Sequence, residues 1–409
     1  MKWDNSMKPL LIVVLMMVAL IVQGCGLSDS AITKSKPEDN TFYHTETDAN
    51  EKTDGISEEE LLDKEVRTIL DNMTLKQKIF QMFIVTPEAL VKNNSVIDAG
   101  DVTQNLLQEY PVGGLVFFTS NLICEEQTAQ MLQSIQKLAT ATVGLPAFLC
   151  VDEEGGRVAR IGNNDGFQVP KVGAMGDIKS AEQAYTAGDT IGQYLKSLGF
   201  NLDFAPDADV LTNKNNSAIG NRSFGSDPYK VLSYASEFSN GLHKNGILST
   251  FKHFPGHGGT EADTHEGMAY TNKTYEELLH SELVPFAGAG KADVDFIMLS
   301  HICVPKVTGD DTPCSLSYQM ATEILREELG YEGLVITDAM NMGAIVQKYT
   351  CEEATVSAIM AGADIVLMPE NLDQAVQGVL SAVEDGDISE ARIEESVARI
   401  IKTKLQMER

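Results

Sequence analysis

Eight short apolar runs, separated by longer amphipathic stretches, constrain the fold of this chain more than any other feature of its 409 residues. The runs have the length and composition of buried strands, and the stretches between them have the length and apolar spacing of helices. The strands are expected at 81–85, 114–118, 147–151, 202–205, 247–251, 296–300, 334–337 and 364–368, and the helices at 127–138, 181–198, 228–245, 275–291, 317–329 and 371–384. This alternation predicts an α/β protein with a (β/α)₈ TIM-like barrel.

A doubly wound open sheet is the competing architecture. However, no Gly-x-Gly-x-x-Gly sequence follows an early strand, as it would in a dinucleotide-binding fold of that kind. In a barrel, the reactive groups come from the carboxyl ends of the strands and from the loops after them. Polar residues follow several expected strands at this point: Asp152, Asp207, Lys252, His253, His301 and Asp338. The barrel therefore predicts that these side chains share one rim.

Residues 1–24 have the pattern of a bacterial lipoprotein signal peptide. Lys2 and Lys8 accompany an apolar run at 10–22, which is short for a membrane span and ends in V-Q-G-C at 22–25. This ending resembles a lipobox, which implies cleavage before Cys25 and lipidation of its thiol. We therefore expect an extracytoplasmic protein that contacts the membrane through a lipid anchor only. An uncleaved signal anchor is the alternative.

Residues 25–60 follow as a flexible acidic linker, because this segment has too few large apolar residues to bury a core. Residues 61–409 contain no second break of this kind and are expected to form one catalytic domain, which we expect to be a monomer. The net charge of −28 argues against a nucleic-acid partner. The remaining cysteines have no paired spacing, which indicates buried thiols: Cys124, Cys150, Cys303, Cys314 and Cys351.

A glycine-rich segment directly after the strand expected at 247–251 concentrates groups for proton transfer. It contains K-H-F-P-G-H-G-G-T at 252–260 and D-T-H at 263–265, so that His253, His257 and His265 are near Asp263 in the sequence. These residue types also bind zinc, but their spacing fits no His-Glu-x-x-His helix, and Pro255 among the glycines breaks any helix there. Acid–base chemistry without a metal is therefore the favoured interpretation.

Five motifs, in order, resemble those of the family 3 glycoside hydrolases. They are V-D-E-E-G-G-R-V at 151–158, N-R-S-F at 221–224, K-H-F-P-G-H-G at 252–258, D-T-H at 263–265 and I-T-D-A-M-N-M at 336–342. Within that family they are most similar to the bacterial β-N-acetylglucosaminidases (β-N-acetylhexosaminidases) that act on cell-wall fragments. The resemblance runs through nearly all of residues 61–409. It implies a retaining exo-glycosidase that removes terminal β-linked GlcNAc from peptidoglycan fragments or related glycans, with no cofactor.

The resemblance also implies catalytic roles for three residues. Asp338 matches the nucleophile, because a retaining glycosidase needs an ionised carboxylate at the anomeric carbon. His265 matches the acid/base and Asp263 the residue that orients it, whereas most glycosidases use a second carboxylate. An imidazole titrates at about pH 6.5, which suits both proton transfers near neutrality. Taken alone, Asp338 could equally be a helix N-cap and His265 a surface residue.

Four further residues match the family's binding groups for hydroxyls of the terminal sugar: Asp152, Arg222, Lys252 and His253. Each has a structural alternative, such as a rim salt bridge or a hydrogen-bonded core histidine. His257 is left open between loop scaffold and site, and His301 is expected to pack behind the site. One departure from the family pattern is Gly259, where many relatives have Asp. The loop is therefore expected to be more mobile or differently braced.

Three alternatives to a hydrolase of this specificity stay open. A β-N-acetylglucosaminide phosphorylase would use the same groups, because a neutral His base repels phosphate less than a carboxylate does. A β-glucosidase or β-xylosidase of the same family would differ at the 2-acetamido group, for which the residues give no independent indication. A non-catalytic, sugar-binding lipoprotein would keep the anchor and linker but would need no nucleophile.

Overall fold

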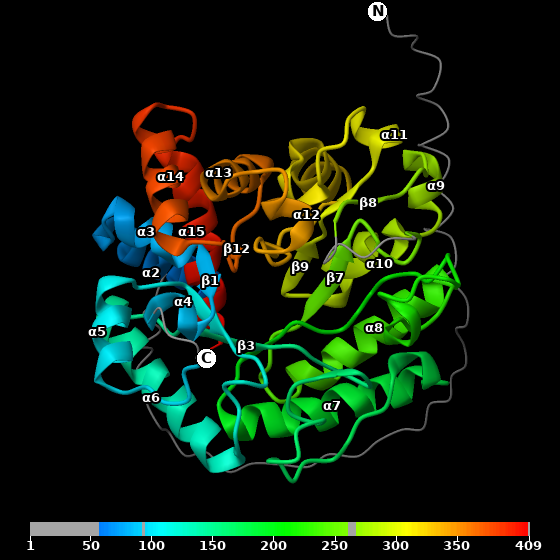
Figure 1. Ribbon diagram of the computed structural model, residues 1–409, viewed down its shortest axis with the longest axis horizontal. Coiled ribbons are helices and arrows are strands. Elements are labelled where there is room, and N and C mark those ends of the chain that lie inside the picture. The colour runs from blue at the N-terminus through cyan, green and yellow to red at the C-terminus, as the bar shows by residue number, and fades with distance from the viewer. Residues whose placement is uncertain (1–56, 92–94, 261–266, 408–409) are drawn as a thin grey trace, which may run out of the picture. The chain divides into compact units, whose positions relative to one another are not determined.

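The computed structural model describes residues 57–91, 95–260 and 267–407 (Figure 1). Cys25, Asp263 and His265 lie outside these ranges, so the predictions about them stay predictions. The described residues all belong to one compact unit, Ile56–Arg409. Strands and helices alternate along it, which confirms the α/β class.

Each of the eight expected strand segments contains a strand. These are β1 (Phe83–Val85), β2 (Gly114–Val116), β3 (Phe148–Val151), β6 (Leu202–Asp203), β7 (Thr250–Phe254), β9 (Phe296–Leu299), β11 (Leu334–Thr337) and β12 (Val366–Leu367). Every pair among them is parallel, and the residues are buried, as expected for strands covered by helices on the outside. β7 begins later than expected, because the backbone N–H of Ser249 donates to Asp295 Oδ2 (2.8 Å) and not to a neighbouring strand. Lys252 and His253 therefore lie within the strand.

The strands do not form the single closed ladder that the barrel prediction requires. They form a five-stranded sheet in the order β12-β1-β2-β3-β6 and a three-stranded sheet in the order β11-β9-β7. Among the described residues, isolated bridges join the sheet edges, from Leu202 to Leu248 and from Asp207 to Lys252 at one edge and from Ile336 to Ile365 at the other.

Further short strands and 3₁₀ turns lie outside the two larger sheets. β4 (Glu153–Gly155) pairs antiparallel with β5 (Val158–Ala159), and β8 (Ala269–Tyr270) pairs parallel with β10 (Ile302–Cys303). Brief 3₁₀ turns occur at η2 (Met175–Asp177), η3 (Gly220–Arg222), η4 (Ala289–Ala292) and η5 (Cys314–Leu316). η3 contains Arg222 of the predicted site, and β4 directly follows Asp152.

The expected helices at 127–138, 181–198, 228–245 and 371–384 are confirmed as α6 (Glu125–Val143), α7 (Ala181–Leu198), α8 (Pro228–His243) and α14 (Leu372–Glu384). The others are α2 (Glu58–Asn72), α3 (Leu75–Gln81), α4 (Pro87–Val91), α5 (Asp101–Glu109), α9 (Tyr275–Leu279), α10 (Leu283–Gly288), α11 (Pro305–Thr308), α12 (Gly343–Val346), α13 (Cys351–Ala361) and α15 (Glu390–Gln406). In Figure 1, α7 and α8 lie side by side outside the strands.

Two helix predictions need correction. The single helix expected at 275–291 is divided into α9, α10 and η4, because Pro285 cannot continue a helix from the turn before it. The helix expected at 317–329 is π-helical over η6 (Gln319–Glu328). The first described helix, α2, begins at Glu58, because Ser57 and Glu60 form a reciprocal capping box.

The core agrees with the cysteine prediction, except at one position. The five described cysteines are free thiols; four are buried, but Cys124 is only half-buried, at the N-cap of α6. Large aromatic side chains such as Phe148 and Phe296 meet edge to face between the sheets, with centroids 5.4 Å apart. Among the described helices, none is both long enough and apolar enough to cross a bilayer.

Candidate active site

The predicted sugar-binding residues and the predicted nucleophile line one cavity of about 320 Å³. Asp152 directly follows β3, and Asp338 directly follows β11, so both come from carboxyl ends of strands. Lys252 and His253 come from β7, and Arg222 from η3. The structure therefore brings all five described residues to one cavity, which the positional argument predicts for Asp152, Lys252, His253 and Asp338. The positional argument also includes Asp207 and His301, but neither of them lines this cavity.

Glu154 lies at the centre of this site but was not among the predicted residues. Its side chain is 1% exposed and accepts two hydrogen bonds from Arg222, from Nε to Oε2 and from Nη2 to Oε1, both 2.8 Å long. The Lys252 ammonium lies 2.6 Å from Glu154 Oε1. Burial, the largest influence, raises the pKa of Glu154, but the two cations outweigh it and hold the pKa below its ordinary value. Glu154 is thus a fixed negative charge that orients two binding cations.

A sequence signal for Glu154 exists in the spacing Asp152-Glu153-Glu154. Residues two apart on extended backbone face the same side, so Glu154 points into the site with Asp152. Glu153 points away and accepts hydrogen bonds from the N–H groups of Ile161 and Gly162 and from the Tyr194 hydroxyl. Burial raises the pKa of Glu153, although these hydrogen bonds oppose the shift.

Lys252 is a buried cation held between two carboxylates. Its Nζ donates to Asp152 Oδ1 (2.8 Å) and also contacts Glu154, and its side chain is 3% exposed. Burial, the largest influence, lowers the pKa of Lys252, but Asp152 and Glu154 outweigh it, so that the pKa is raised. Lys252 therefore stays charged at any working pH.

His253 is held by Asp209, a second residue that the sequence analysis missed. His253 Nδ1 lies 2.7 Å from Asp209 Oδ2, so it donates there and leaves Nε2 on the other side of the ring, 3.4 Å from Arg222 Nη2. Burial lowers the pKa of His253, but the Asp209 carboxylate outweighs it and raises the pKa. Asp209 follows Asp207 by two residues after β6, the same alternation that identifies Glu154.

Asp207, Asp209 and His253 offer ligand atoms within 4.8 Å of one another, a spacing compatible with a metal ion. Arg222 argues against that use, because its guanidinium lies 3.4 Å from Asp207 Oδ2 and 3.4 Å from His253 Nε2. A divalent cation there would meet a fixed positive charge at close range. Burial, followed by the neighbouring Asp209, raises the pKa of Asp207 to about 7. The cluster therefore fits an arginine-centred network better than a metal centre.

Asp338 lines the cavity without capping a helix. Its backbone N–H donates to Leu299 O (2.8 Å), which continues the pairing of β11 with β9. Its carboxylate accepts from the N–H of Ala339 (2.7 Å), but the next helix, α12, begins only at Gly343, with Met342 as its N-cap. The helix-cap alternative for Asp338 is therefore excluded, and the carboxylate is half-buried at the cavity wall.

His301 and His257 support the site from behind. His301 is fully buried, with Nδ1 2.8 Å from Ser315 Oγ and Nε2 3.0 Å from the carbonyl oxygen of Ala339, so it packs behind the site as expected. The main-chain N–H of His257 donates to Asp209, which ties the glycine-rich turn to the His253 network. Burial lowers the pKa of the His257 imidazole.

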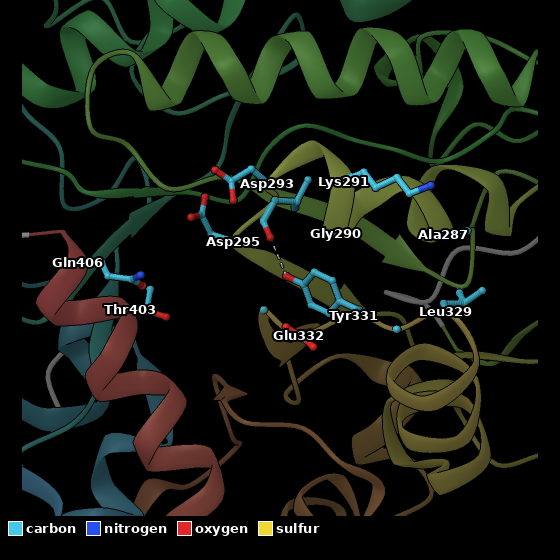
Figure 2. A pocket seen from close by; sticks show the side chains of 13 residues that line it. Ala287, Gly290, Lys291, Asp293, Asp295, Leu329, Tyr331, Glu332, Thr403 and Gln406 are labelled. Atoms are coloured by element: carbon cyan, nitrogen blue, oxygen red, sulfur yellow. Dashed lines mark hydrogen bonds between the residues drawn. The ribbon is translucent and has the colours of Figure 1, made fainter. Parts of the chain in front are cut away.

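A different cavity, of about 450 Å³, lies at the opposite ends of the strands, before β9 and β11 begin (Figure 2). Asp293, Asp295 and Lys291 line it, and the Tyr331 hydroxyl donates to the carbonyl oxygen of Val294 (3.1 Å). None of the described site residues lines this cavity. The larger of these two cavities is therefore not the one that the sequence-predicted polar residues line; those residues line the smaller cavity.

The parallel α/β framework and a small cavity with convergent acidic and basic side chains form a site of the kind that binds a small polar substrate in an enzyme. The family model for the glycosyl hydrolase family 3 N-terminal domain matches residues 74–403. The chain therefore belongs to glycosyl hydrolase family 3, which confirms the family and the enzyme class predicted from the motifs.

Named relatives agree with this membership. The chain is 33% identical over 333 residues to beta-hexosaminidase A of Pseudoalteromonas piscicida, covering 74% of this chain and 54% of that protein. It is 31% identical to beta-hexosaminidase LpqI of Mycobacterium tuberculosis, covering 80% of this chain and 82% of that one. A family 3 beta-N-acetylglucosaminidase from Paenibacillus sp. strain FPU-7 superimposes with a TM-score of 0.76 at 35% identity, covering 82% of this chain and 64% of that chain.

Proposed function

We propose that this chain is a retaining exo-β-N-acetylglucosaminidase in which Asp338 is the nucleophile. The observation that carries the proposal is the position of the Asp338 carboxylate on the wall of a cavity that also contains Asp152, Arg222, Lys252 and His253. Asp338 attacks the anomeric carbon, the bond to the leaving oxygen breaks, and a glycosyl ester forms. Water then attacks the same carbon and releases Asp338.

The charged groups of the cavity are the proposed binding groups for the terminal sugar. Lys252 and Arg222 are permanent cations fixed by Glu154, so they can donate charged hydrogen bonds to ring hydroxyls without having to be ordered first. Asp152 offers acceptor oxygens on the same wall. A volume of about 320 Å³ suits one sugar residue better than a polysaccharide chain, which supports exo action.

The proposed acid/base pair is His265 oriented by Asp263, and both lie outside the described residues. In the first step the His265 imidazolium gives its proton to the leaving oxygen, and in the second the neutral imidazole takes a proton from the incoming water. The described end of that segment, Gly256–Thr260, is connected to the cavity residue His253 through Asp209, which accepts hydrogen bonds from the His257 N–H and from His253 Nδ1. The mechanism uses groups of this chain only.

The finer assignments belong to the same proposal. A (β/α)₈ barrel in the sense of the family is supported by the isolated bridges that join the two sheets at both edges. A lipidated Cys25, an extracytoplasmic location and a monomeric state rest on the sequence patterns at 1–60. Peptidoglycan fragments are the proposed substrate, because several relatives are named β-hexosaminidases and the motifs resemble enzymes that act on the cell wall.

Product analysis with the disaccharide GlcNAc-MurNAc, with and without inorganic phosphate, tests this function. The proposal predicts free GlcNAc at the same rate in both conditions. GlcNAc 1-phosphate that appears only with phosphate would replace the hydrolase by a phosphorylase. Faster release of glucose or xylose from the matching aryl glycosides would reassign the specificity. Binding of the sugar without any turnover would leave only a sugar-binding lipoprotein.

A further inference from the structure

Gly259 is packed against a buried carboxylate that comes from a distant part of the chain. A Cβ atom at Gly259 would lie 2.8 Å from Glu282 Oε1 and 3.0 Å from Thr212 Oγ1. The backbone of Gly259 is not in the left-handed region, so the missing side chain reflects lack of space and not backbone strain. A carboxylate attached to that Cβ would fall on the place that Glu282 Oε1 now occupies.

Glu282 is 1% exposed and connects three segments. Its Oε1 accepts hydrogen bonds from Thr212 Oγ1 (2.6 Å) and from Lys273 Nζ (2.5 Å), and Ser281 Oγ donates to Oε2. Lys273 is 29% exposed at its side chain and is the cation that neutralises the buried carboxylate. Because a buried charge is costly without a partner, these contacts hold Glu282 and Lys273 together.

The same contacts hold both ends of the segment between Gly259 and Lys273. At one end, Asn213 Nδ2 donates to the carbonyl oxygen of Thr260 (3.0 Å), and the Asn213 N–H donates to that of Gly258 (3.1 Å). Thr212, the neighbour of Asn213, bonds Glu282. At the other end, Lys273 itself donates to Glu282. Glu282 thus joins the departure point and the return point of the segment whose sequence contains Asp263 and His265.

We propose that Glu282 is a positioning residue for the acid/base step, and that it supplies, from the position just before α10, the carboxylate that this chain lacks at Gly259. The inference rests on the function proposed above. Glu282 touches no reacting atom in this account; it acts by fixing where the segment begins and ends. An error of about 1 Å in placing a proton donor can cost about 10²-fold in rate.

Moving the carboxylate from one position to the other provides the test. Four proteins are compared: the wild type, Gly259→Asp, Glu282→Ala, and the double variant. Hydrolysis is measured on a 4-nitrophenyl N-acetyl-β-glucosaminide and on the methyl glycoside, whose leaving group needs protonation. Glu276→Gln is the matched control, because this exposed glutamate in α9 lies close in sequence but outside the contacts of Glu282. Thermal unfolding confirms that each protein is folded.

Two results are expected. Gly259→Asp alone lowers kcat/KM on the methyl glycoside by at least about tenfold, because two carboxylates then compete for one place, whereas the same substitution in the Glu282→Ala background raises it by about tenfold. The changes on the nitrophenyl substrate are smaller, because its leaving group needs little acid assistance. Glu276→Gln changes neither rate.

A folded double variant whose kcat/KM on the methyl glycoside is no higher than that of Glu282→Ala overturns the inference. So does a Gly259→Asp variant that loses kcat/KM equally on both substrates. If Glu282→Ala does not fold, Glu282→Gln, which keeps the shape and removes the charge, replaces it. Glu282→Gln should then lose more kcat/KM on the methyl glycoside than on the nitrophenyl glycoside; a folded Glu282→Gln with equal losses on both substrates, or with none, overturns the inference. A wild type that hydrolyses neither glycoside would instead remove the proposed function itself.

Discussion

Two buried lysines at opposite ends of strand β3 show how differently this fold treats the same side chain. Lys252 is 2% exposed near the carboxyl end of β3 and contacts Asp152 and Glu154. Lys404, from α15, is 1% exposed at the amino end, where its Nζ donates to Gln81 Oε1 (2.8 Å) and lies 5.0 Å from the Phe148 ring centroid.

The surroundings of the two ammonium groups explain the difference between them. Burial is the largest influence on both, but two carboxylates raise the pKa of Lys252, whereas no described carboxylate bonds Lys404 and its pKa falls to about 7. Lys252 is therefore a fixed charge beside a cavity, and Lys404 is a core residue that titrates. Burial alone does not identify a functional lysine; the carboxylates around it and the open cavity do.

The largest expected effect comes from removing the nucleophile at the Lys252 end. Asp338→Ala should lower turnover by about 10⁴-fold or more, because no glycosyl ester can form. Rates on an aryl N-acetylglucosaminide and the urea midpoint of unfolding should be measured together. A variant that keeps a tenth of the wild-type rate, free of contaminating enzyme, would contradict the nucleophile assignment.

A direct comparison of the two lysines comes next. Lys252→Met should lower kcat/KM by about 10²-fold, because it removes a binding cation and takes one of their cationic partners away from Asp152 and Glu154. Lys404→Met, the matched change at the other end, should leave kcat/KM within about twofold, since it alters only the core. Similar losses of kcat/KM in both variants would contradict the distinction between a functional lysine at the carboxyl end of β3 and a core lysine at its amino end.

The pH dependence of stability should follow Lys404 and not Lys252. The folded pKa of Lys404 is lowered to about 7 from an unfolded value near 10.5, so its contribution is complete above pH 10.5 and is lost as the pH falls toward 7. Between these limits the wild type should gain up to about 1.4 kcal/mol of unfolding free energy per pH unit relative to Lys404→Met. Urea unfolding of both proteins at pH 7 and pH 9 measures this gain. An equal change in unfolding free energy between pH 7 and pH 9 in both proteins would show that the pKa of Lys404 is not lowered in the folded state.

The smallest effect is expected for a lysine at the surface. Lys244 lies 2.8 Å from Asp189, but its side chain is 53% exposed. Lys244→Gln should therefore change neither the thermal midpoint nor kcat/KM measurably, because solvent screens such a pair. A clear loss in either measurement would show that ion pairing alone, without burial, carries weight in this protein.

The sequence predicted the strands well but not the way in which their ladder is interrupted. Apolar runs located each strand of the two larger sheets, because burial on both faces leaves a continuous apolar signature in the residues, but they did not locate the short strands β4, β5, β8 and β10. The division of the helix expected at 275–291 depends on Pro285. This proline is visible in the sequence, but hydrophobic periodicity does not reflect a single missing N–H group.

The candidate site was predicted only in part. The motifs identified Asp152, Arg222, Lys252, His253 and Asp338, which the structure brings to one cavity. They did not identify Glu154 and Asp209, whose roles depend on contacts with Arg222 and His253 across the fold. Such contacts between distant segments are set by tertiary packing, although the two-residue spacing after Asp152 and Asp207 could have suggested them.

The most direct measurement of the central claim is covalent trapping of the glycosyl-enzyme. The protein is incubated with a 5-fluoro N-acetylglucosaminyl donor, digested, and the labelled peptide is identified by mass spectrometry. The account predicts one sugar bound per protein, on the carboxylate of Asp338, and no label in Asp338→Ala. A label on another carboxylate would contradict the account. So would an Asp338→Ala variant that still turns over the donor.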